Sequence, residues 1–486
     1  MQTAEETVTL SRVEYDKLQA DLVYFKHQLT ELRRLVFGTK SERFIATNGD
    51  VSQLPLFEGE VREEEAETDP QTITYQRKPQ TKEKQHPIRA LLPAHLPRQE
   101  EVIEPEELNE GSRKIGEEVT EILEHTPGKL YVRRIVRPKY VTANEEGVSI
   151  ASLPSFPIPK GNAGAGLLAH LLISKYVDHL PFYRQVQMFK REGVKLSEST
   201  INGWFKAVCK LMEPLYEEIR KQVLNSTYVK ADETPIPVQS SNKSGATHTG
   251  YLWVYQSPEK KLVIFDYQKS RGAQGPKDFF TGYKGALQTD GYVGYEQFDD
   301  DPNIMMLGCM AHARRYFEKA LDNDQSRAEH VLTEIQKLYA LERKAKEHSL
   351  TAEQLTELRL KEALPILEAL HEWMKDQYNQ VAPKSSIGKA LAYSLKFWGR
   401  LVRYTENGNW HIDNNLVENS IRPVALGRKN YLFAGSHNGA QWAAMMYSFL
   451  GTCKLNEVNP HEWLKHTLNK IPDTPVNRLD YLLPQN

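Results

Sequence analysis

The stretch Thr227-Tyr-Val-Lys-Ala-Asp-Glu-Thr-Pro235 decides the fold of this 486-residue chain, because it predicts a buried strand that carries an acid to its end. Apolar residues alternate up to Ala231, and Asp232 follows where we expect the strand to end in a turn. The stretch Gly285-Ala-Leu-Gln-Thr-Asp290-Gly-Tyr292 predicts a second short strand, again with an aspartate at its carboxyl end. The two stretches together predict a sheet that presents two aspartates.

A third acid follows 128 residues after Asp290 (418 − 290), in Asp413-Asn-Asn-Leu-Val-Glu418-Asn-Ser-Ile-Arg422. This segment opens like a helix capped by Asp or Asn. Carboxylate oxygens are the ligands that Mg²⁺ prefers, and a pair of such ions about 3.5–4 Å apart stabilises the attacking and leaving oxygens of a phosphoryl transfer. We therefore expect Asp232, Asp290 and Glu418 to be catalytic metal ligands for Mg²⁺, with Mn²⁺ as a substitute.

Two alternatives to this metal site stay open at the level of sequence. Short motifs match by chance, so the aspartates could be ordinary turn residues and Glu418 a solvated helix residue. Other acids could also serve as ligands, namely Glu233, Asp266 and Asp413, although Asp413 fits the N-cap of the helix better.

The elements around the two aspartates follow a ribonuclease-H-like order. Expected strands cover 228–231, 251–255, 262–267, 286–289 and 304–307, with a short helix at 276–280 and another helix from about 311. Residues from about 321 to 404 are almost purely helical by pattern and rich in Leu, Glu, Lys and Ala. We therefore expect a multidomain α/β protein whose ribonuclease-H-like core carries an all-α insertion before its last helix.

The amino-terminal region predicts a coiled coil followed by a linker. Apolar residues recur in steps of three and four at Tyr15, Leu18, Leu22, Phe25, Leu29, Leu32 and Val36. This spacing indicates about three heptads, although a plain amphipathic helix has the same pattern. The segment 58–69 holds seven acids and one arginine, and 76–89 is polar, basic and proline-containing, which is typical of a linker.

Residues 159–224 predict a helical domain of the helix-turn-helix kind. A helix over 183–190, a turn at 192–194 and a second helix that starts near Ser197 form this pattern, which an ordinary helical hairpin would share. The expected groove and phosphate contacts of this domain are Arg184, Lys190, Arg191, Lys195 and Asn202.

A second basic set lies close to the acids in sequence. Arg422 follows Glu418 by one helical turn, and no acid occurs between Asn419 and Phe433, so this set predicts phosphate contacts. A solvated basic helix end is the alternative. The residues of this second basic set that we expect to contact phosphate are His312, Arg314, Arg315, Arg422, Arg428 and Lys429. Cys309 and His312 form half of a zinc site at most, so zinc is not expected.

Composition excludes several classes of protein. Hydrophobic residues make up 40% and charged residues 26% of the chain, and no run of 18 apolar residues predicts a membrane span. Three widely spaced cysteines and the lack of a secretion signal favour a reducing cytoplasm. The net charge of −2 means that any DNA binding must use local basic surfaces.

Six stretches of the chain are similar to the transposases of the bacterial insertion sequence 66 family. They are 160–170, 174–185, 231–235, 309–315, 418–430 and 477–484. The resemblance spans nearly the whole chain. It implies a DDE-type transposase with Asp232, Asp290 and Glu418 as its acids. Relatives carry paired Cys-x-x-Cys motifs for zinc in the region 101–158, but this chain has no cysteine before Cys209.

The predicted organisation combines these features. The expected domains are a leucine-zipper-like helix (1–44), a linker (45–100), a zinc-finger-like remnant without cysteines (101–158), the helix-turn-helix-like domain (159–224), the first part of the core (225–320), the all-α insertion (321–405), the second part of the core (406–445) and a C-terminal element (446–486).

The resulting expectation is a metal-dependent DNA transposase that cuts at the ends of its element and joins them to target DNA. Its expected partners are those DNA ends, target DNA, a second copy of the chain or a higher oligomer, and small accessory proteins. We expect it in the bacterial cytoplasm, associated with the nucleoid and not with membranes. The alternatives are a nuclease that cuts without joining, and a DNA-binding regulator or inactive transposase remnant.

Overall fold

The computed structural model describes residues 154–159, 161–240 and 245–485, the backbone of two short strands, and residues 128, 130 and 132. The short strands are β1 (Lys139–Val141) and β2 (Val148–Ile150), which pair antiparallel within a unit that covers 52–153. The predicted coiled coil, the linker and most of the zinc-finger-like region lie outside the described residues.

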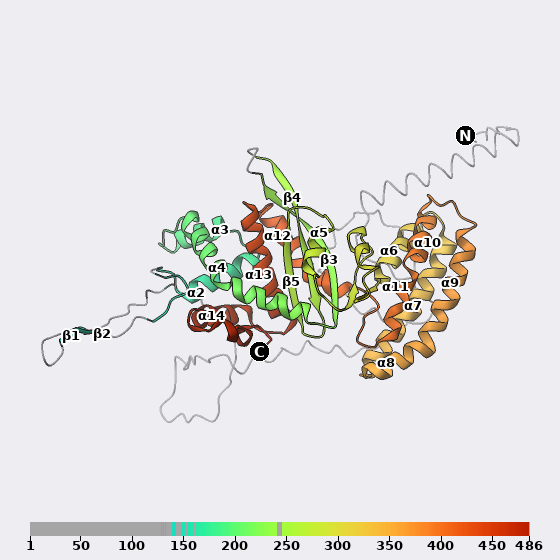
Figure 1. The fold of residues 1–486 in the computed structure, drawn as a ribbon. Helices are drawn as coiled ribbons and strands as arrows, with labels where there is room; N and C mark the ends of the chain where they lie inside the picture. Colours follow the sequence, from blue (N-terminus) through green and yellow to red (C-terminus); the bar gives the residue numbers. More distant parts are fainter. Residues whose placement is uncertain are drawn as a thin grey trace, which may run out of the picture. The chain divides into compact units, whose positions relative to one another are not determined.

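A five-stranded mixed sheet forms the centre of the second unit (Figure 1). Its strands are β3 (Tyr228–Gln239), β4 (Thr247–Ser257), β5 (Leu262–Gln268), β6 (Gly285–Gln288) and β7 (Ile304–Leu307), in the spatial order β5-β4-β3-β6-β7. The β3–β4–β5 half is antiparallel, and β6 and β7 run parallel to β3. The mixed α/β core and all five expected strands are therefore present.

One detail of the prediction was wrong, because β3 does not end in a turn after Asp232. The strand continues to Gln239 and passes through Pro235 and Pro237. Its pairing with β6 covers only Tyr228 to Lys230, whereas its pairing with β4 runs to Gln239. Beyond Lys230 one side of β3 therefore has no strand to bond, and a proline on such an edge costs no ladder hydrogen bond.

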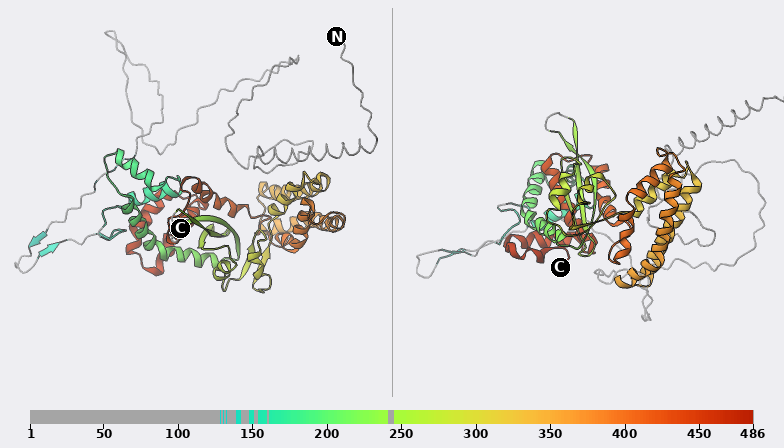
Figure 2. Two further views of the ribbon diagram at one scale, coloured as in Figure 1. Left: turned by 90° about the horizontal axis from the view of Figure 1, so that it is seen from above. Right: turned by 45° about the vertical axis from the view of Figure 1, so that its right-hand side comes forward.

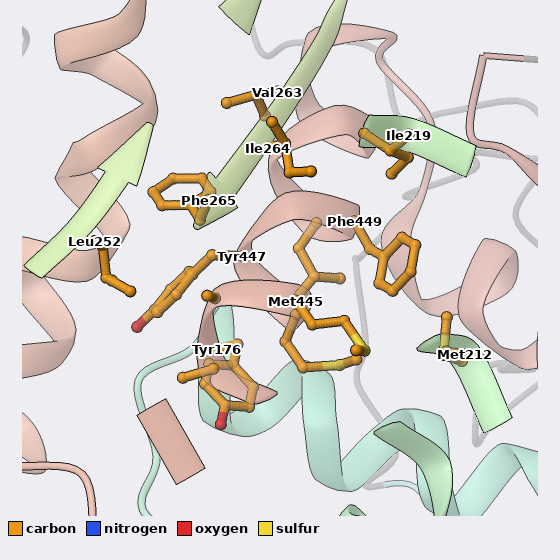
Figure 3. Close-up of a cluster of buried hydrophobic side chains, with 14 of the residues drawn as sticks. Tyr176, Met212, Ile219, Leu252, Val263, Ile264, Phe265, Met445, Tyr447 and Phe449 are labelled. Atoms are coloured by element: carbon orange, nitrogen blue, oxygen red, sulfur yellow. The ribbon is translucent and has the colours of Figure 1, made fainter. Parts of the chain in front are cut away.

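Five helices share one core with the antiparallel half of the sheet. They are α2 (Ala165–Tyr176), α3 (Phe182–Arg191), α4 (Glu198–Leu224), α13 (His437–Leu455) and α14 (Pro460–Lys470). Helices α4 and α13 pack on the strands, and the other three pack against these helices. Figure 3 shows Tyr176 of α2, Met212 and Ile219 of α4, and Met445, Tyr447 and Phe449 of α13 meeting Leu252, Val263, Ile264 and Phe265 of the sheet. Burial of these side chains supplies the main stabilisation of this unit.

Helix α13 also accepts hydrogen bonds from the backbone of the edge strand β5. The buried hydroxyl of Ser448 accepts a hydrogen bond from the Phe265 N–H at 2.8 Å, and Thr452 accepts one from the Val263 N–H at 3.3 Å. A side chain at Gly451 would meet Val263 at 2.7 Å, so glycine permits this close approach. The hydroxyls satisfy backbone donors that an uncovered sheet edge would expose.

The helices expected in the helix-turn-helix-like domain are present as α3 and α4. Gly193, between them, has a φ of +81°, a conformation that glycine adopts readily. The Ser197 side chain caps α4 by accepting from the Thr200 N–H at 3.1 Å. The predicted turn and cap are thus confirmed as local structure, whereas DNA binding by these helices stays a prediction.

Residues 321–405 contain helices and no strand, and they build a second hydrophobic core (Figures 1 and 2, yellow to orange). This insertion comprises α7 (Gln325–Glu347), α8 (Ala352–Leu358), η2 (Arg359–Ala363), α9 (Leu364–Tyr378), α10 (Ser386–Lys396), α11 (Trp398–Val402) and η3 (Arg403–Glu406). Arg359 is 1% exposed and ties the bundle together through two bonds to Glu342 and two to the carbonyls of Tyr404 and Asn407.

Six further elements complete the described fold. They are α5 (Gln274–Phe279), η1 (Val293–Phe298), α6 (Met310–Ala320), α12 (Asn415–Asn430), η4 (Ile471–Asp473) and η5 (Val476–Leu482). The chain leaves the sheet through α6, passes through the insertion and returns in α12, which packs against β3. Among the described helices, none is long and apolar enough to span a membrane.

Candidate active site

Three carboxylates from two adjacent parallel strands form the candidate site. One oxygen from each of Asp232, Glu233 and Asp290 lies within 4.8 Å of the other two. The register explains the meeting, because Lys230 of β3 pairs with Gln288 of β6, and each aspartate lies two residues further along its own chain. Residues at matching positions of neighbouring parallel strands lie side by side, so the two aspartates predicted as ligands come together just beyond the last paired residues of β3 and β6.

The loop after β6 fixes the position of Asp290. Gly291 has a φ of +89°, and a side chain there would meet the Phe397 ring at 3.0 Å. The Asp290 carboxylate accepts from the Tyr292 N–H at 2.9 Å, and Tyr393 of α10 donates its hydroxyl to the Asp290 carbonyl at 2.5 Å. The helical insertion therefore helps to hold the loop that carries the second acid.

Glu233 is the acid in this group that the sequence ranked only as a rival ligand. Its side chain is 3% exposed, and its Oε1 accepts from Arg271 Nε at 2.9 Å and Nη2 at 2.5 Å. The Arg271 guanidinium lies 4.0 Å from the centre of the Tyr292 ring, and Tyr292 donates its hydroxyl to the Arg271 carbonyl at 2.7 Å. One cation thus offsets part of the clustered negative charge.

Burial and the remaining negative charge raise the pKa values of two of the clustered carboxyl groups. Burial, followed by the charges of Glu233 and Asp290, raises the pKa of Asp232 well above its ordinary value. Burial and Asp290 likewise raise the pKa of Glu233, against the lowering effect of Arg271. Glu233 Oε2 is buried and accepts no hydrogen bond among the described residues. Like charges gathered out of water, with an orphan oxygen among them, fit the donor set of a hard cation.

Glu418 lies on the first turn of α12 and faces two residues of α6. Its Oε2 accepts from Arg315 Nη2 at 2.6 Å, and its Oε1 lies 3.8 Å from His312 Nδ1. Oε1 is buried and accepts no hydrogen bond from the described residues. Glu418 is not one of the three mutually close acids, but its charge adds to the rise in the pKa of Asp232. The third predicted acid is thus within electrostatic reach of the cluster while paired with an arginine.

A buried network fixes the start of α12 against the sheet. Lys230 is completely buried and donates from Nζ to the Asp413 carbonyl at 2.7 Å. Asn414 donates its side-chain amide to the Ala231 carbonyl at 2.8 Å and its backbone N–H to Cys309 Sγ at 3.2 Å. Burial raises the pKa of the Cys309 thiol to about 12, so this sulfur is a neutral acceptor. The network positions the helix that carries Glu418.

Two of the acids considered as rival ligands serve other purposes. Asp413 is not the N-cap, which is Asn414; its carboxylate accepts instead from the Asn415 N–H at 3.0 Å and the Tyr339 hydroxyl at 2.9 Å. The N-cap interpretation was therefore off by one residue, because the short Asp413 turn precedes the helix. Asp266 on β5 accepts from Gln268 at 2.8 Å and is outside the acid group.

The basic residues near the acids fall into four settings. His312 and Arg315 face Glu418, whereas Arg314 is largely buried in an ion pair with Glu318 at 2.9 Å. Arg428 of α12 donates to the Pro235 carbonyl of β3. The solvent-exposed members are Arg422 and Lys429.

The basic residues of the helix-turn-helix-like domain are exposed on α3 and the following turn, at Arg184, Lys190, Arg191 and Lys195. Asn202 is also exposed and donates its side-chain amide to the Glu198 carbonyl of its own helix at 2.8 Å. These positions leave the four cations accessible to phosphates.

Comparison with known proteins assigns the chain. Residues 160–442 match the Transposase IS66 family, and this match includes all three predicted acids. The chain belongs to the IS66 transposase family. Two further matches agree with that family: residues 448–485 match the IS66 C-terminal element, and residues 24–100 match the Transposase C of IS166 homeodomain. IS66 membership supports a DDE-type transposase role and a DNA-binding region.

Relatives of similar length occur in Sinorhizobium fredii. The uncharacterized protein y4jD is 30% identical over 515 aligned residues, which cover 100% of this chain and 97% of y4jD. The uncharacterized protein y4hP is 31% identical over 493 residues, which cover 95% of this chain and 88% of y4hP. The similarity to these IS66-like proteins therefore extends over the whole architecture.

Sequence reasoning missed two residues that shape the site. The sequence does contain an indication for Lys230, because a lysine at an inward position of an apolar alternation needs a buried partner. The sequence contains no such indication for Arg271, since this residue lies in a polar loop 38 residues after Glu233 and nothing in that loop points to its partner.

Proposed function

We propose that the chain is the DNA transposase of an insertion sequence, with Asp232, Asp290 and Glu418 as its catalytic acids. The observation that carries this proposal is the β3–β6 register, which brings two acids 58 residues apart to one sheet edge beside the helix of the third. Family membership supplies the substrate class, which is the DNA at the ends of the element. The strand order β5-β4-β3-β6-β7 supports a ribonuclease-H-like core.

The donor set suits divalent cations such as Mg²⁺ or Mn²⁺. Asp232, Asp290 and Glu418 would hold them, and the buried Glu233 Oε2 offers a further oxygen. The chemistry that a bound cation pair supplies is activation of the attacking oxygen and stabilisation of the leaving oxygen in a phosphoryl transfer. No covalent enzyme intermediate is required, so no serine or tyrosine needs a nucleophilic role.

The reaction has two chemically matched steps. In the first, a water oxygen bonds to phosphorus at the element end, and the departing 3′-oxygen becomes a free hydroxyl. In the second, this hydroxyl attacks a phosphorus of target DNA and displaces the 3′-oxygen of the target strand. Each step exchanges one phosphodiester oxygen for another, which is why one acidic site can serve both.

The residues around Glu418 have roles in this scheme. We expect the Arg315 guanidinium, now 2.6 Å from Glu418, to exchange that carboxylate for a phosphate oxygen when DNA binds. His312 would orient the same phosphate from the adjacent turn of α6. Arg422, Arg428 and Lys429 would contact flanking phosphates, and α3 and α4 would bind DNA further from the acids.

The assembly around the chain is part of the same proposal. We propose a homodimer or higher oligomer, since two DNA ends must be joined to one target, and small accessory proteins of the same element as possible partners. The setting of this activity would be the nucleoid of a bacterial cytoplasm.

The test is an assay of cleavage and joining with the full chain. Labelled DNA carrying the element's own ends is incubated with Mg²⁺, Mn²⁺ or EDTA, for the wild type and for Asp232→Asn, Asp290→Asn and Glu418→Gln. The exposed Asp300→Asn is the matched control. We expect metal-dependent nicking and strand-transfer products, reduced about 1,000-fold in each acid variant and unchanged in the control.

Other outcomes of this assay point to different functions. Nicking without any joined product would indicate a nuclease. Binding of the ends without cleavage under any metal condition would indicate a regulator or an inactive remnant. Activity that survives Glu418→Gln would remove Glu418 from the catalytic acids.

A further inference from the structure

A cavity of about 380 Å³ is lined by residues of α2, α4, β3, α12, the α12–α13 junction and α13, and none of the three predicted acids lines it. Its walls are largely aromatic, with Phe205 from α4, Phe433 from the α12–α13 junction and Trp442 from α13. Phe433 is 46% exposed, so one wall is an accessible aromatic ring. This volume and lining are typical of a site for a single small ligand.

The charged residues of the cavity are positive. Lys175 and Arg428 line it, and no carboxylate does so among the described lining residues. The Lys175 ammonium lies 3.9 Å from the centre of the Phe182 ring and 5.3 Å from that of Phe205. Among the described residues it has neither a hydrogen-bond acceptor nor an acidic partner. A cation held among rings without an anion favours an anionic ligand.

Backbone donors add to this preference. Gly435, Ser436 and Gly439 line the cavity at the amino terminus of α13, a helix of 19 residues. The Gly439 N–H donates to the Ser436 hydroxyl at 3.0 Å, whereas the N–H groups before it in the first turn have no partner within the helix, and such groups attract phosphate. The cavity therefore combines two cations and a helix terminus with aromatic faces, which is the combination that a nucleotide requires.

Two elements lead from the acids to this cavity. Ile236 lines it and lies four residues after Asp232 on β3, which is about 13 Å of strand. Arg428 lies ten residues after Glu418 on α12, which is about 15 Å of helix. Both spans correspond to about four nucleotide steps at 3.4 Å per step of one strand.

We propose that the cavity binds one unpaired nucleotide of the DNA strand that runs into the acid cluster. Its phosphate bonds to Lys175 and Arg428, and its base stacks on Phe433 or Trp442. The cavity admits a single base and not a base pair, so that base must leave the helix. This inference rests on the proposed transposase function and adds a subsite that fixes the register of the DNA end about four nucleotides from the cut.

The experiment uses the full chain and element-end DNA that carries 2-aminopurine at one position at a time. Binding is measured in Ca²⁺ by fluorescence, and cleavage is measured separately in Mg²⁺. We expect a fluorescence change at a position about four nucleotides from the cut that is absent at its neighbours. Gly435→Leu, which fills open space in the cavity, should abolish that change and weaken binding about tenfold.

Matched variants separate the cavity from general stability. Gly399→Leu also adds a side chain into open space, but in the helical insertion, and should leave the signal and the affinity unchanged. Lys175→Met keeps the length of the side chain and removes its charge. It should weaken DNA binding about tenfold without lowering the melting temperature, whereas a purely structural lysine would lower that temperature.

Three results would overturn the proposal. If the wild type cleaves the DNA but no position responds, the subsite is absent and the transposase function stands. If the wild type neither binds nor cleaves element ends, the proposed function fails and the subsite with it. If free dAMP fills the cavity as tightly as the DNA does, the cavity is a site for free nucleotides.

Discussion

Asp232 and Lys230 are two residues apart on β3, and their environments show how much the sequence revealed at the scale of single side chains. The local alternation indicated that Asp232 and Asp290 lie near one another, although Asp232 is not at the end of its strand. Lys230 belongs to the same alternation, but its acceptor is the Asp413 carbonyl, 183 residues later. Local patterns determine which face a side chain occupies, whereas a partner so distant follows only from the assembled fold.

Lys230 should act as a positioning residue for Glu418. In Lys230→Met the bond to the Asp413 carbonyl is lost, so the start of α12 and the carboxylate of Glu418 gain freedom. We expect cleavage to fall about tenfold, as is common for residues that orient metal ligands, and the Mg²⁺ concentration for half-maximal cleavage to rise. Cleavage is measured over a Mg²⁺ titration, with the exposed Lys210→Met as the control. An unchanged Mg²⁺ dependence would contradict the positioning role.

At the scale of elements, strands and helices followed from periodicity, and the errors arose where tertiary pairing overrides local signals. The strand was expected to end in a turn at Asp232, yet β3 continues to Gln239, where its distal half pairs with β4 alone. The helical pattern in the 128-residue gap before Glu418 agrees with the helices found there, whereas an insertion into a ribonuclease-H-like core stays a prediction. The contact of these helices with the site did not follow from the sequence, since Tyr393 reaches the Asp290 carbonyl across 103 residues.

The edge strand β5 gives a test at this scale. Ser448→Ala removes the acceptor of the Phe265 N–H and leaves a donor buried beneath α13. An unsatisfied buried backbone donor costs about 1–3 kcal/mol, so we expect the free energy of unfolding to fall by that amount. Urea unfolding followed by tryptophan fluorescence measures it, and the exposed Ser326→Ala should change the value by less than about 0.5 kcal/mol. A loss as small as that of the control would mean that water reaches this edge.

For the whole molecule, the two cores have separate tasks. The sheet and its covering helices bring the two aspartates together through strand register, and the insertion holds the Asp290 loop and returns the chain to α12. The amino-acid pattern predicted both cores, because each is built from contiguous periodic segments. It did not predict the cavity, whose cations and rings come from four elements that no local pattern links.

The stability of the whole molecule should also depend on pH through Lys175 in that cavity. Burial lowers the pKa of Lys175 to about 8, against an ordinary value of 10.5, and the nearby Cys209 opposes this shift only weakly. Between these values the unfolded chain binds more protons than the folded chain, so the contribution of Lys175 to the free energy of unfolding rises with pH by about 3 kcal/mol.

Other groups around the cavity titrate in the same range, so the prediction concerns a difference between two proteins. Burial raises the pKa values of Cys209, Tyr176, Tyr431 and Tyr447, which lowers the stability of both proteins as pH rises. The Lys175→Met variant loses more, because Lys175 no longer lowers the pKa of Cys209, and this adds to the expected difference. The free energy of unfolding of the wild type minus that of Lys175→Met should therefore increase between pH 7.5 and 10.5. Urea unfolding in phosphate-free buffers measures this difference, and Lys210→Met controls for the loss of one positive charge. A flat difference would mean that Lys175 already has an anionic partner in solution, and the cavity would then have no unpaired cation to offer to a phosphate.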